Sequence, residues 1–362
     1  MKLLQLFFVL SILSLLSCSS DNSPITPGNP EPIPSEIYFP PINSNAWETV
    51  SLSELGWNAN KLQPLLDYLE TKITKGFIIL HHGKIVIEQY FNGHSSNASW
   101  YWASAGKTLT ATLSGIAQDE GLIDIHLKVS DYLGIKWTSI PLEKENLISC
   151  KHLLNMTSGL DDGLGDDVSP ENLQYLADAG TRWAYHNVYV KMQDVVEHAS
   201  NQTWDTYFNN KLRDKIGMTG SWISFGNLKV YTSNTRSMAR FGLLLYADGK
   251  WKNTQIVSET YISEATNTSQ NINQAYGYLW WLNGKSSFHL PTTQIEFQGE
   301  LIPNAPADMF MALGKNDQKL YVVPSKNLVV VRMGEVANPD NPTFGLSGFD
   351  NELWEKILEL TN

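Results

Sequence analysis

Residues 76–91 read GFIILHHGKIVIEQYF, which places two apolar runs with β-branched residues on either side of a polar turn containing Gly83. This pattern is typical of a β-hairpin. Further strand patterns occur only near the other end of the chain, at residues 278–282, 309–313, 319–323 and 328–333. Because strand patterns stand at both ends of the sequence, we expect one antiparallel sheet built from both ends.

Leucines at helical spacing predict a helix over residues 60–72, directly before the hairpin. The middle of the chain reads mostly as helices and long loops, with helices expected at 104–119, 149–157, 188–199, 204–216 and 234–246, and a closing amphipathic helix at 351–360. We therefore predict an α+β fold of the sandwich type. Residues 46–103 and 269–362 form the sheet with flanking helices, and residues 104–268 form a mostly helical inserted domain. We expect the site in a cleft between these two parts.

The composition excludes several classes of protein. The chain has 362 residues, of which 42% are hydrophobic and 17% charged, so it is neither disordered nor a coiled coil. Its 26 Lys and Arg residues against 37 Asp and Glu residues give a net charge of −11. This is the wrong sign for binding phosphate backbones, so we expect no nucleic-acid partner.

The N-terminus predicts export. Residues 1–17 carry one positive charge and an apolar run too short to span a bilayer, which is typical of a signal peptide. The run ends in Leu15-Leu16-Ser17-Cys18, which resembles a bacterial lipobox, so we expect Cys18 to be lipidated and to anchor the protein to a membrane of the cell envelope. An ordinary secretory leader is the alternative. Residues 18–45 hold seven of the 16 prolines and predict a semi-extended tether or a disordered terminus.

The first candidate for chemistry is Ser104-Ala105-Gly106-Lys107, at the start of an expected helix. Residues three apart lie on one face of a helix, so Lys107 can reach Ser104. A lysine activates a serine only where burial or neighbouring charge lowers its pKa. Backbone N–H groups at a helix start can also stabilise an oxyanion. The alternative is a helix-capping serine followed by a solvated lysine.

The second candidate is a tyrosine followed two residues later by an asparagine. Residues i and i+2 of an extended segment project to the same side, and a phenol beside a lysine can move a proton. This pattern starts at Tyr90, Tyr185 and Tyr207. Tyr90 ends the hairpin and Tyr207 lies in an expected helix, whereas Tyr185 and Asn187 lie in a loop leading to a helix. We therefore favour Tyr185 and Asn187.

The pairing of Ser104-x-x-Lys107 with Tyr185-x-Asn187 resembles the serine β-lactamase and penicillin-binding-protein superfamily, specifically its class C-like branch of esterases, amidases and peptidases. Residues 115–122, 152–160 and 238–242 agree with this resemblance. Residues 276–281 and 312–318 look closest to members similar to 6-aminohexanoate-dimer hydrolase. The resemblance covers about residues 50 to 360. It implies a β-lactamase/transpeptidase-like fold.

The resemblance also implies a role for each motif residue. Ser104 would be the acylated nucleophile and, through its backbone N–H, one oxyanion donor. Lys107 would be its base partner, Tyr185 the proton shuttle and Asn187 a positioning amide. No metal or organic cofactor is implied.

The third motif of the superfamily, a Lys or His, any residue and then Gly, is not present in that form. The segment Ala312-Leu313-Gly314 keeps the glycine, with the backbone N–H of Lys315 as second oxyanion donor, but it lacks the cation. The segment Lys315-Asn316-Asp317 keeps a cation but puts Asp at the glycine position. We favour the first, because a side chain is least tolerable where the backbone must pass close to the nucleophile. Without the cation, an ester or amide substrate is favoured over a β-lactam.

Two further groups of residues bear on the site. Trp102, Trp183, Trp280 and Trp281 are expected to line the cleft, although the last two also suit a strand with one ring in the core. The four aspartates within residues 161–167 favour a solvated loop over a calcium site.

These observations predict a lipid-anchored serine hydrolase facing the periplasm or the cell exterior. Its substrate would be a small molecule or a short peptide, cleaved at an ester or amide through an acyl-enzyme on Ser104. A class C β-lactamase or a DD-peptidase acting on cell-wall peptide is the alternative within enzymes. A non-catalytic binding protein on the same fold is the alternative from another class.

Overall fold

The computed structural model of the protein describes residues 36–339 and 348–362. The predicted signal peptide, Cys18 and most of the tether lie outside these residues. Glu36–Asn362 group as one compact unit, and the division into an α/β domain and a helical domain stays a prediction. Within the described parts, no helix is both long and apolar enough to cross a bilayer.

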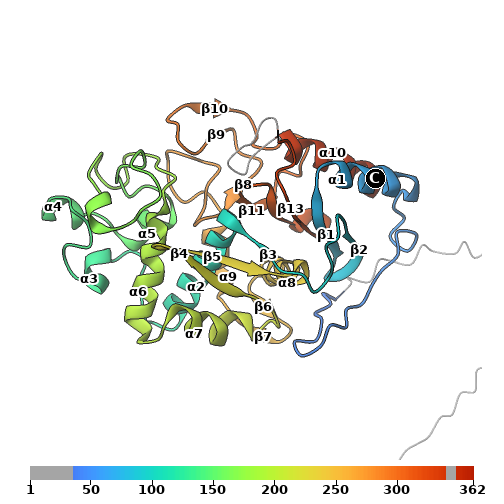
Figure 1. Ribbon diagram of the computed structural model, residues 1–362, viewed down its shortest axis with the longest axis horizontal. Coiled ribbons are helices and arrows are strands. Elements are labelled where there is room, and N and C mark those ends of the chain that lie inside the picture. Colours follow the sequence, from blue (N-terminus) through green and yellow to red (C-terminus); the bar gives the residue numbers. More distant parts are fainter. Residues whose placement is uncertain (1–35, 340–347) are drawn as a thin grey trace, which may run out of the picture. The chain divides into compact units, whose positions relative to one another are not determined.

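The central sheet is antiparallel and has the strand order β2-β1-β13-β12-β11-β8 (Figure 1). Its first two strands, β1 (Thr74–His81) and β2 (Lys84–Tyr90), are the predicted hairpin. The others are β8 (Trp281–Leu282), β11 (Phe310–Gly314), β12 (Gln318–Val323) and β13 (Leu328–Gly334). Ile79 of β1 pairs with Val330 of β13, so the sheet joins both ends of the chain as predicted.

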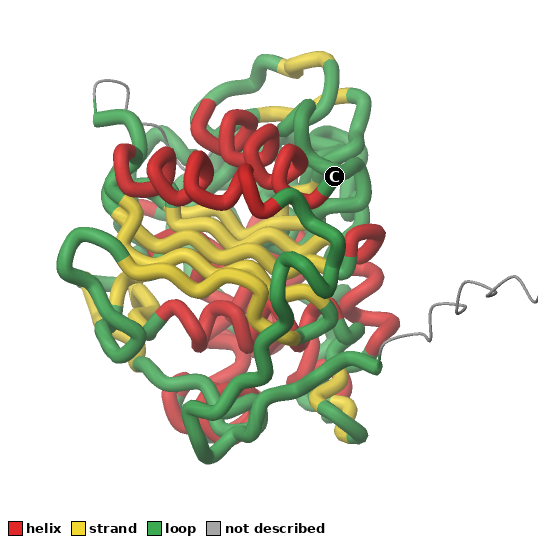
Figure 2. Tube along the Cα trace, turned by 90° about the vertical axis from the view of Figure 1, so that its right-hand side faces the viewer, coloured by secondary structure: helices red, strands yellow, loops and turns green. Residues whose placement is uncertain are grey.

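Helices cover both faces of this sheet (Figure 2). The helices α1 (Leu62–Thr71) and α10 (Gly348–Thr361) pack together, and Trp354 of α10 contacts Tyr321 of β12. On α8 (Thr235–Tyr246), Gly242 lies against Leu320 of the same strand. Because neighbouring strand residues point to opposite faces, α8 and α10 lie on opposite sides of the sheet.

The middle of the chain is mostly helical, as expected. The 3₁₀ turn Ala103–Gly106 leads into α2 (Lys107–Asp119), whose residues 107–117 are all buried. The remaining helices are α3 (Val129–Leu133), α4 (Leu142–Glu145), α5 (Cys150–Leu154), α6 (Lys191–Ser200), α7 (Trp204–Phe208) and α9 (Glu259–Ala265), and the further short turns of helix are Ala59–Lys61, Pro170–Asn172, Asn187–Val190, Asn209–Arg213 and Pro324–Lys326.

The middle of the chain also contains strands that the sequence analysis did not predict. A three-stranded sheet has the order β3-β5-β4, formed by β3 (Trp100–Tyr101), β4 (Ser221–Phe225) and β5 (Leu228–Ser233). Two smaller pairs are β6 (Lys250–Trp251) with β7 (Thr254–Gln255), and β9 (Ser287–His289) with β10 (Glu296–Gln298).

Two predicted boundaries are wrong. The strand expected at 278–282 is reduced to Trp281–Leu282, because the N–H groups of Tyr278 and Leu279 donate to the carbonyls of Ala265 and Leu154 outside the sheet. The tether does not extend to residue 45, because residues 38–45 bind the folded part. The backbone N–H of Tyr38 donates to the carbonyl of His82 at 3.0 Å, and Arg240 donates to the carbonyl of Pro41 at 2.8 Å.

Candidate active site

The turn that carries Ser104 is held against β5 by two hydrogen bonds of Trp102. The backbone N–H of Trp102 donates to the carbonyl of Tyr231 on β5 at 2.9 Å, and its indole N–H donates to Ser233 Oγ at 2.8 Å. Ala103 has a φ of 47°, which is strained for a residue with a side chain. This strained residue lies directly before Ser104, so the fixed neighbours hold the serine in an unusual bend at the start of α2.

Lys107 is placed to act on this serine. Its Nζ donates to Ser104 Oγ at 2.8 Å, and its side chain is only 3% exposed. Burial lowers the pKa of Lys107 from 10.5 to about 7, and the negative charge of Asp166 partly opposes this shift. A substantial share of the amine is therefore neutral near physiological pH and can accept the hydroxyl proton. The structure brings Ser104 and Lys107 together as the spacing predicted.

Tyr185 comes from a distant loop and also reaches Ser104. Its hydroxyl lies close enough to Ser104 for that side chain to lower the pKa of the phenol, and its ring stacks on Trp281 with centroids 5.7 Å apart. Burial raises the pKa of Tyr185 to about 12, and the neighbouring polar groups of Ser104 and Trp281 oppose this shift. The rings of Tyr185 and Tyr189 lie 4.9 and 4.7 Å from Lys107 Nζ. At neutral pH the phenol keeps its proton, so it is suited to relaying a proton rather than holding a negative charge.

Asn187 contacts a carboxylate that the sequence analysis did not connect with the site. Its Nδ2 donates to Asp166 Oδ1 at 2.6 Å. The same loop is attached a second time, because Arg182 donates to Asp162 Oδ1 at 2.7 Å. The loop of residues 161–167 is therefore bound to the segment that carries Tyr185, rather than only solvated as expected. The sequence did contain a signal for this attachment, because Arg182 stands three residues before Tyr185 and could have been paired with the aspartates of residues 161–167.

The segment Ala312-Leu313-Gly314, favoured above as the third motif, passes close to the turn that carries Ser104. A Cβ on Gly314 would lie 2.4 Å from the carbonyl oxygen of Trp102 and 3.0 Å from the backbone nitrogen of Ala105. Only glycine lets β11 pass this close to the turn that carries Ser104. Lys315 follows directly, with an exposed side chain.

The alternative alignment, with Asp317 at the glycine position, is wrong. Asn316 and Asp317 form the turn between β11 and β12, where both have positive φ values of 61° and 58°. The buried carboxylate of Asp317 pairs with Lys319 Nζ at 3.2 Å instead of lying against the nucleophile.

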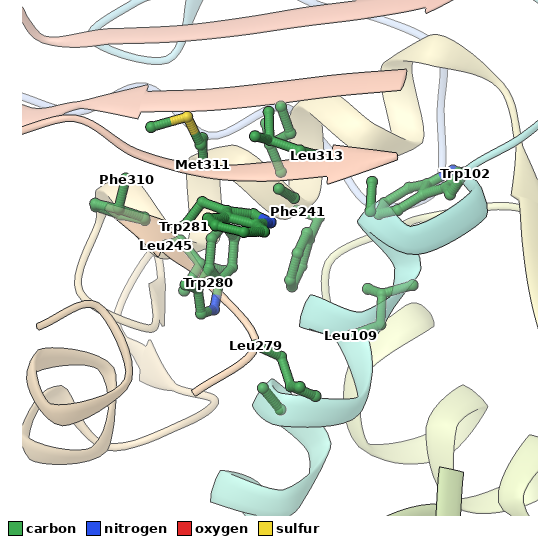
Figure 3. Packing of buried hydrophobic residues seen from close by; sticks show 14 of the residues in the cluster. Trp102, Leu109, Phe241, Leu245, Leu279, Trp280, Trp281, Phe310, Met311 and Leu313 are labelled. Carbon is green, nitrogen blue, oxygen red and sulfur yellow. The ribbon is translucent and has the colours of Figure 1, made fainter. Parts of the chain in front are cut away.

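The four tryptophans do not line an open cleft, which corrects that expectation. Trp102 and Trp183 are fully buried, and Trp280 and Trp281 are only 1% and 4% exposed. Figure 3 shows Trp102, Trp280 and Trp281 in one apolar cluster that also contains Phe310 and Leu313. The rings of Trp183 and Trp281 contact the ring of Tyr185, so they fix the position of the phenol.

The sequence also matches a known family. The family model described as Beta-lactamase matches residues 74–343, which is most of the chain and includes Ser104, Lys107, Tyr185 and Gly314. The chain belongs to the beta-lactamase family. This confirms the predicted superfamily of serine β-lactamases and penicillin-binding proteins.

Several solved structures have the same fold as this chain. A protein from Bacteroides dorei, provisionally assigned as a beta-lactamase, is 15% identical with a TM-score of 0.65, covering 84% of this chain and 99% of its own. A protein from Bacillus anthracis, provisionally assigned as a 6-aminohexanoate-dimer hydrolase, is 17% identical with a TM-score of 0.66, covering 90% of each chain. A beta-lactamase from Mycobacterium bovis is 17% identical with a TM-score of 0.59, covering 83% and 99%. The predicted fold class is thus confirmed. A comparison with curated proteins found no match.

Proposed function

We propose that this beta-lactamase-family chain is a serine hydrolase that cleaves an ester or an amide through an acyl-enzyme on Ser104. The observation that carries the proposal is the contact of one hydroxyl with two proton carriers. Ser104 Oγ lies 2.8 Å from a buried amine whose pKa is about 7, and the same hydroxyl is close enough to Tyr185 to lower the pKa of the phenol. A binding protein has no need for a buried lysine of this kind, because burying an amine costs stability.

The reaction starts when neutral Lys107, with Tyr185 as relay, takes the proton of the Ser104 hydroxyl. Oγ attacks the substrate carbonyl, and the negative charge on its oxygen is stabilised by the backbone N–H groups of Ser104 and Lys315. The bond to the leaving alcohol or amine then breaks, and the leaving group takes the proton through Tyr185. Water then attacks the acyl carbon and gives a proton to Lys107 through Tyr185. The bond from this carbon to Ser104 Oγ breaks, Oγ takes the proton back, and the acid is released.

The third motif supports an ester or amide over a β-lactam. Ala312 occupies the position where the superfamily pattern has a cation, so a substrate carboxylate would lack that partner on β11. A β-lactamase or DD-peptidase is the second candidate. It is favoured by the exposed Lys315 side chain, which directly follows Gly314.

A fluorophosphonate probe tests the proposal. We expect covalent labelling of the wild-type protein, none of Ser104→Ala, and full labelling of a control variant at an exposed serine on a nearby loop, Ser95→Ala. An unlabelled wild-type protein would contradict the proposal and favour the binding protein. Fast nitrocefin turnover that depends on Ser104 would instead favour the β-lactamase.

We also propose that the mature protein is a lipoprotein of the cell envelope, anchored through Cys18. The support is the lipobox-like sequence and the proline-rich segment that separates it from the folded part. We expect incorporation of labelled palmitate in the wild-type protein and its loss in Cys18→Ala. Equal incorporation in both proteins would refute the anchor.

A further inference from the structure

A cavity of about 500 Å³ lies beside the turn that carries Ser104. One wall comes from Trp100, Tyr101 and Ala103, and the other from Ile223, Phe225 and Val230 of β4 and β5. Ala103, which lines the cavity, is the residue directly before Ser104 in the chain. Its size is within the usual range for small-molecule sites.

The apolar lining of this cavity is unusual for a solvent-facing sheet. Ile223 and Phe225 alternate along β4, and Ile223 pairs with Val230, so these three side chains share one face. This face is open to solvent, since Phe225 is 62% and Ile223 43% exposed. The opposite face is also apolar, because the ring of Trp222 packs against Phe208 and Tyr231. A solvated sheet face normally carries polar residues, and large exposed apolar groups mark binding sites.

The cavity and Tyr185 contact different strands of the central sheet. Two residues that line the cavity are bonded to the central sheet near β12 and β13. The indole of Trp100 donates to the carbonyl of Gly334, which ends β13. The hydroxyl of Tyr101 accepts from Asn316, in the turn before β12, at 2.7 Å. Tyr185 instead stacks on Trp281 of β8, the strand on the other side of β11. The leaving group must lie near Tyr185 to receive its proton, which leaves the cavity for the acyl part of the substrate.

We propose that the cavity over the β3-β5-β4 sheet binds the acyl chain of the substrate, so that the protein prefers esters or amides of apolar, medium-length acids. This inference rests on the proposed hydrolase function. Each methylene that enters the cavity should raise kcat/KM about fourfold until the cavity is full, since this is the gain from burying one CH₂.

The test uses 4-nitrophenyl esters of linear acids from acetate to decanoate with the full-length protein. We expect kcat/KM of the wild type to rise with acyl length. In Phe225→Ser and in the double variant with Ile223→Ser, that rise should flatten, while acetate turnover stays within about twofold. Phe225 and Ile223 are exposed, so these changes should leave the fold intact. Ile135→Ser is the matched control, because Ile135 is 59% exposed and does not line the cavity. It should keep the wild-type slope.

A second series, acetates of linear alcohols, separates the acyl part from the leaving group. We expect its length dependence to be the same in the wild type and in the hairpin variants. A flattened alcohol series with an unchanged acyl series would overturn the assignment of the cavity. So would a wild type that shows no preference for longer acyl chains.

Binding to Ser104→Ala distinguishes failure of this inference from failure of the proposed function. With the nucleophile removed, we expect decanoate to bind more tightly than butyrate, and Phe225→Ser in the same background to abolish the difference. This result supports the cavity even if the wild type hydrolyses no ester. Equal binding of both acids refutes it even if ester turnover is fast.

Discussion

Lys107 holds its amine in a site with almost no solvent, and the protonation of this group controls the proposed reaction. Its lowered pKa of about 7 means that the active, neutral form gains population as the pH rises. We therefore expect kcat/KM for an ester to increase from pH 5.5 to 8.5 with a midpoint near 7. Lys107→Arg should lose turnover throughout this range, because arginine stays charged. A wild-type rate that is flat or falls with pH would contradict this role.

Asp166 should set the position of that midpoint. Its negative charge raises the pKa of Lys107 against the effect of burial, so Asp166→Asn should lower this pKa and move the midpoint to lower pH. Asp167→Asn is the matched control, because Asp167 on the same loop binds Ser169 and Asn227 instead. pH profiles of kcat/KM measure the effect. An identical midpoint in wild type and Asp166→Asn would show that Asp166 acts only on Asn187.

For individual residues, sequence spacing predicted contacts within one helix better than contacts between two loops. Ser104 and Lys107 are one helical turn apart, so their contact follows from helix geometry. The contact of Asn187 with Asp166 joins two loops, and no local pattern encodes it. The four tryptophans were wrongly expected to line the cleft, because proximity to a motif in sequence does not tell which way a large apolar ring points. Burial in the core stabilises such a ring more than exposure in a cleft does.

Among the secondary-structure elements, β11 depends on one glycine. In Gly314→Ala the new methyl group would lie 2.4 Å from the carbonyl oxygen of Trp102, so β11 must move away from the nucleophile turn. We expect ester turnover to fall by about a hundredfold or more, as for a lost oxyanion donor. Gly348→Ala, where a Cβ meets nothing within 4 Å, should keep near wild-type rates. Similar rates in all three proteins would show that β11 does not supply the oxyanion donor.

The β4–β5 hairpin shows which elements sequence reasoning misses. Its strands flank Gly226-Asn227, a known hairpin turn signal. Its apolar residues, however, lie on both faces, so the alternation that marks a half-buried strand is absent. The same property that hid this element makes one of its faces suitable for binding an apolar chain.

Across the whole molecule, a buried ionic network connects the end of the sheet near the site to the last helix. Lys319 Nζ lies 2.8 Å from Asp350 of α10 and 3.2 Å from Asp317, and Tyr321 donates to Asp350 at 2.6 Å. Breaking a buried pair typically costs about 3–5 kcal/mol. We expect Asp350→Asn to lower the free energy of unfolding by about this amount in denaturant titrations.

Glu352→Gln provides the control for this prediction, because Glu352 on the same helix is 53% exposed and makes its contacts, with Lys72 and with the hydroxyl of Tyr68, at the protein surface. It should change the free energy of unfolding by less than about 1 kcal/mol. Equal effects of the two substitutions would mean that the buried network adds nothing to stability.

The two-ended sheet was predictable because its strands are strongly apolar and separated by a long helical stretch. The pairing of Ile79 with Val330 has a further result for biosynthesis. While the ribosome is still synthesising the helical middle of the chain, β1 has been made but its neighbour β13 has not. The growing chain therefore exposes one unpaired strand edge, which can pair with other chains, until synthesis is nearly complete. A premature stop anywhere before β13 would leave that edge permanently open, and such fragments should aggregate.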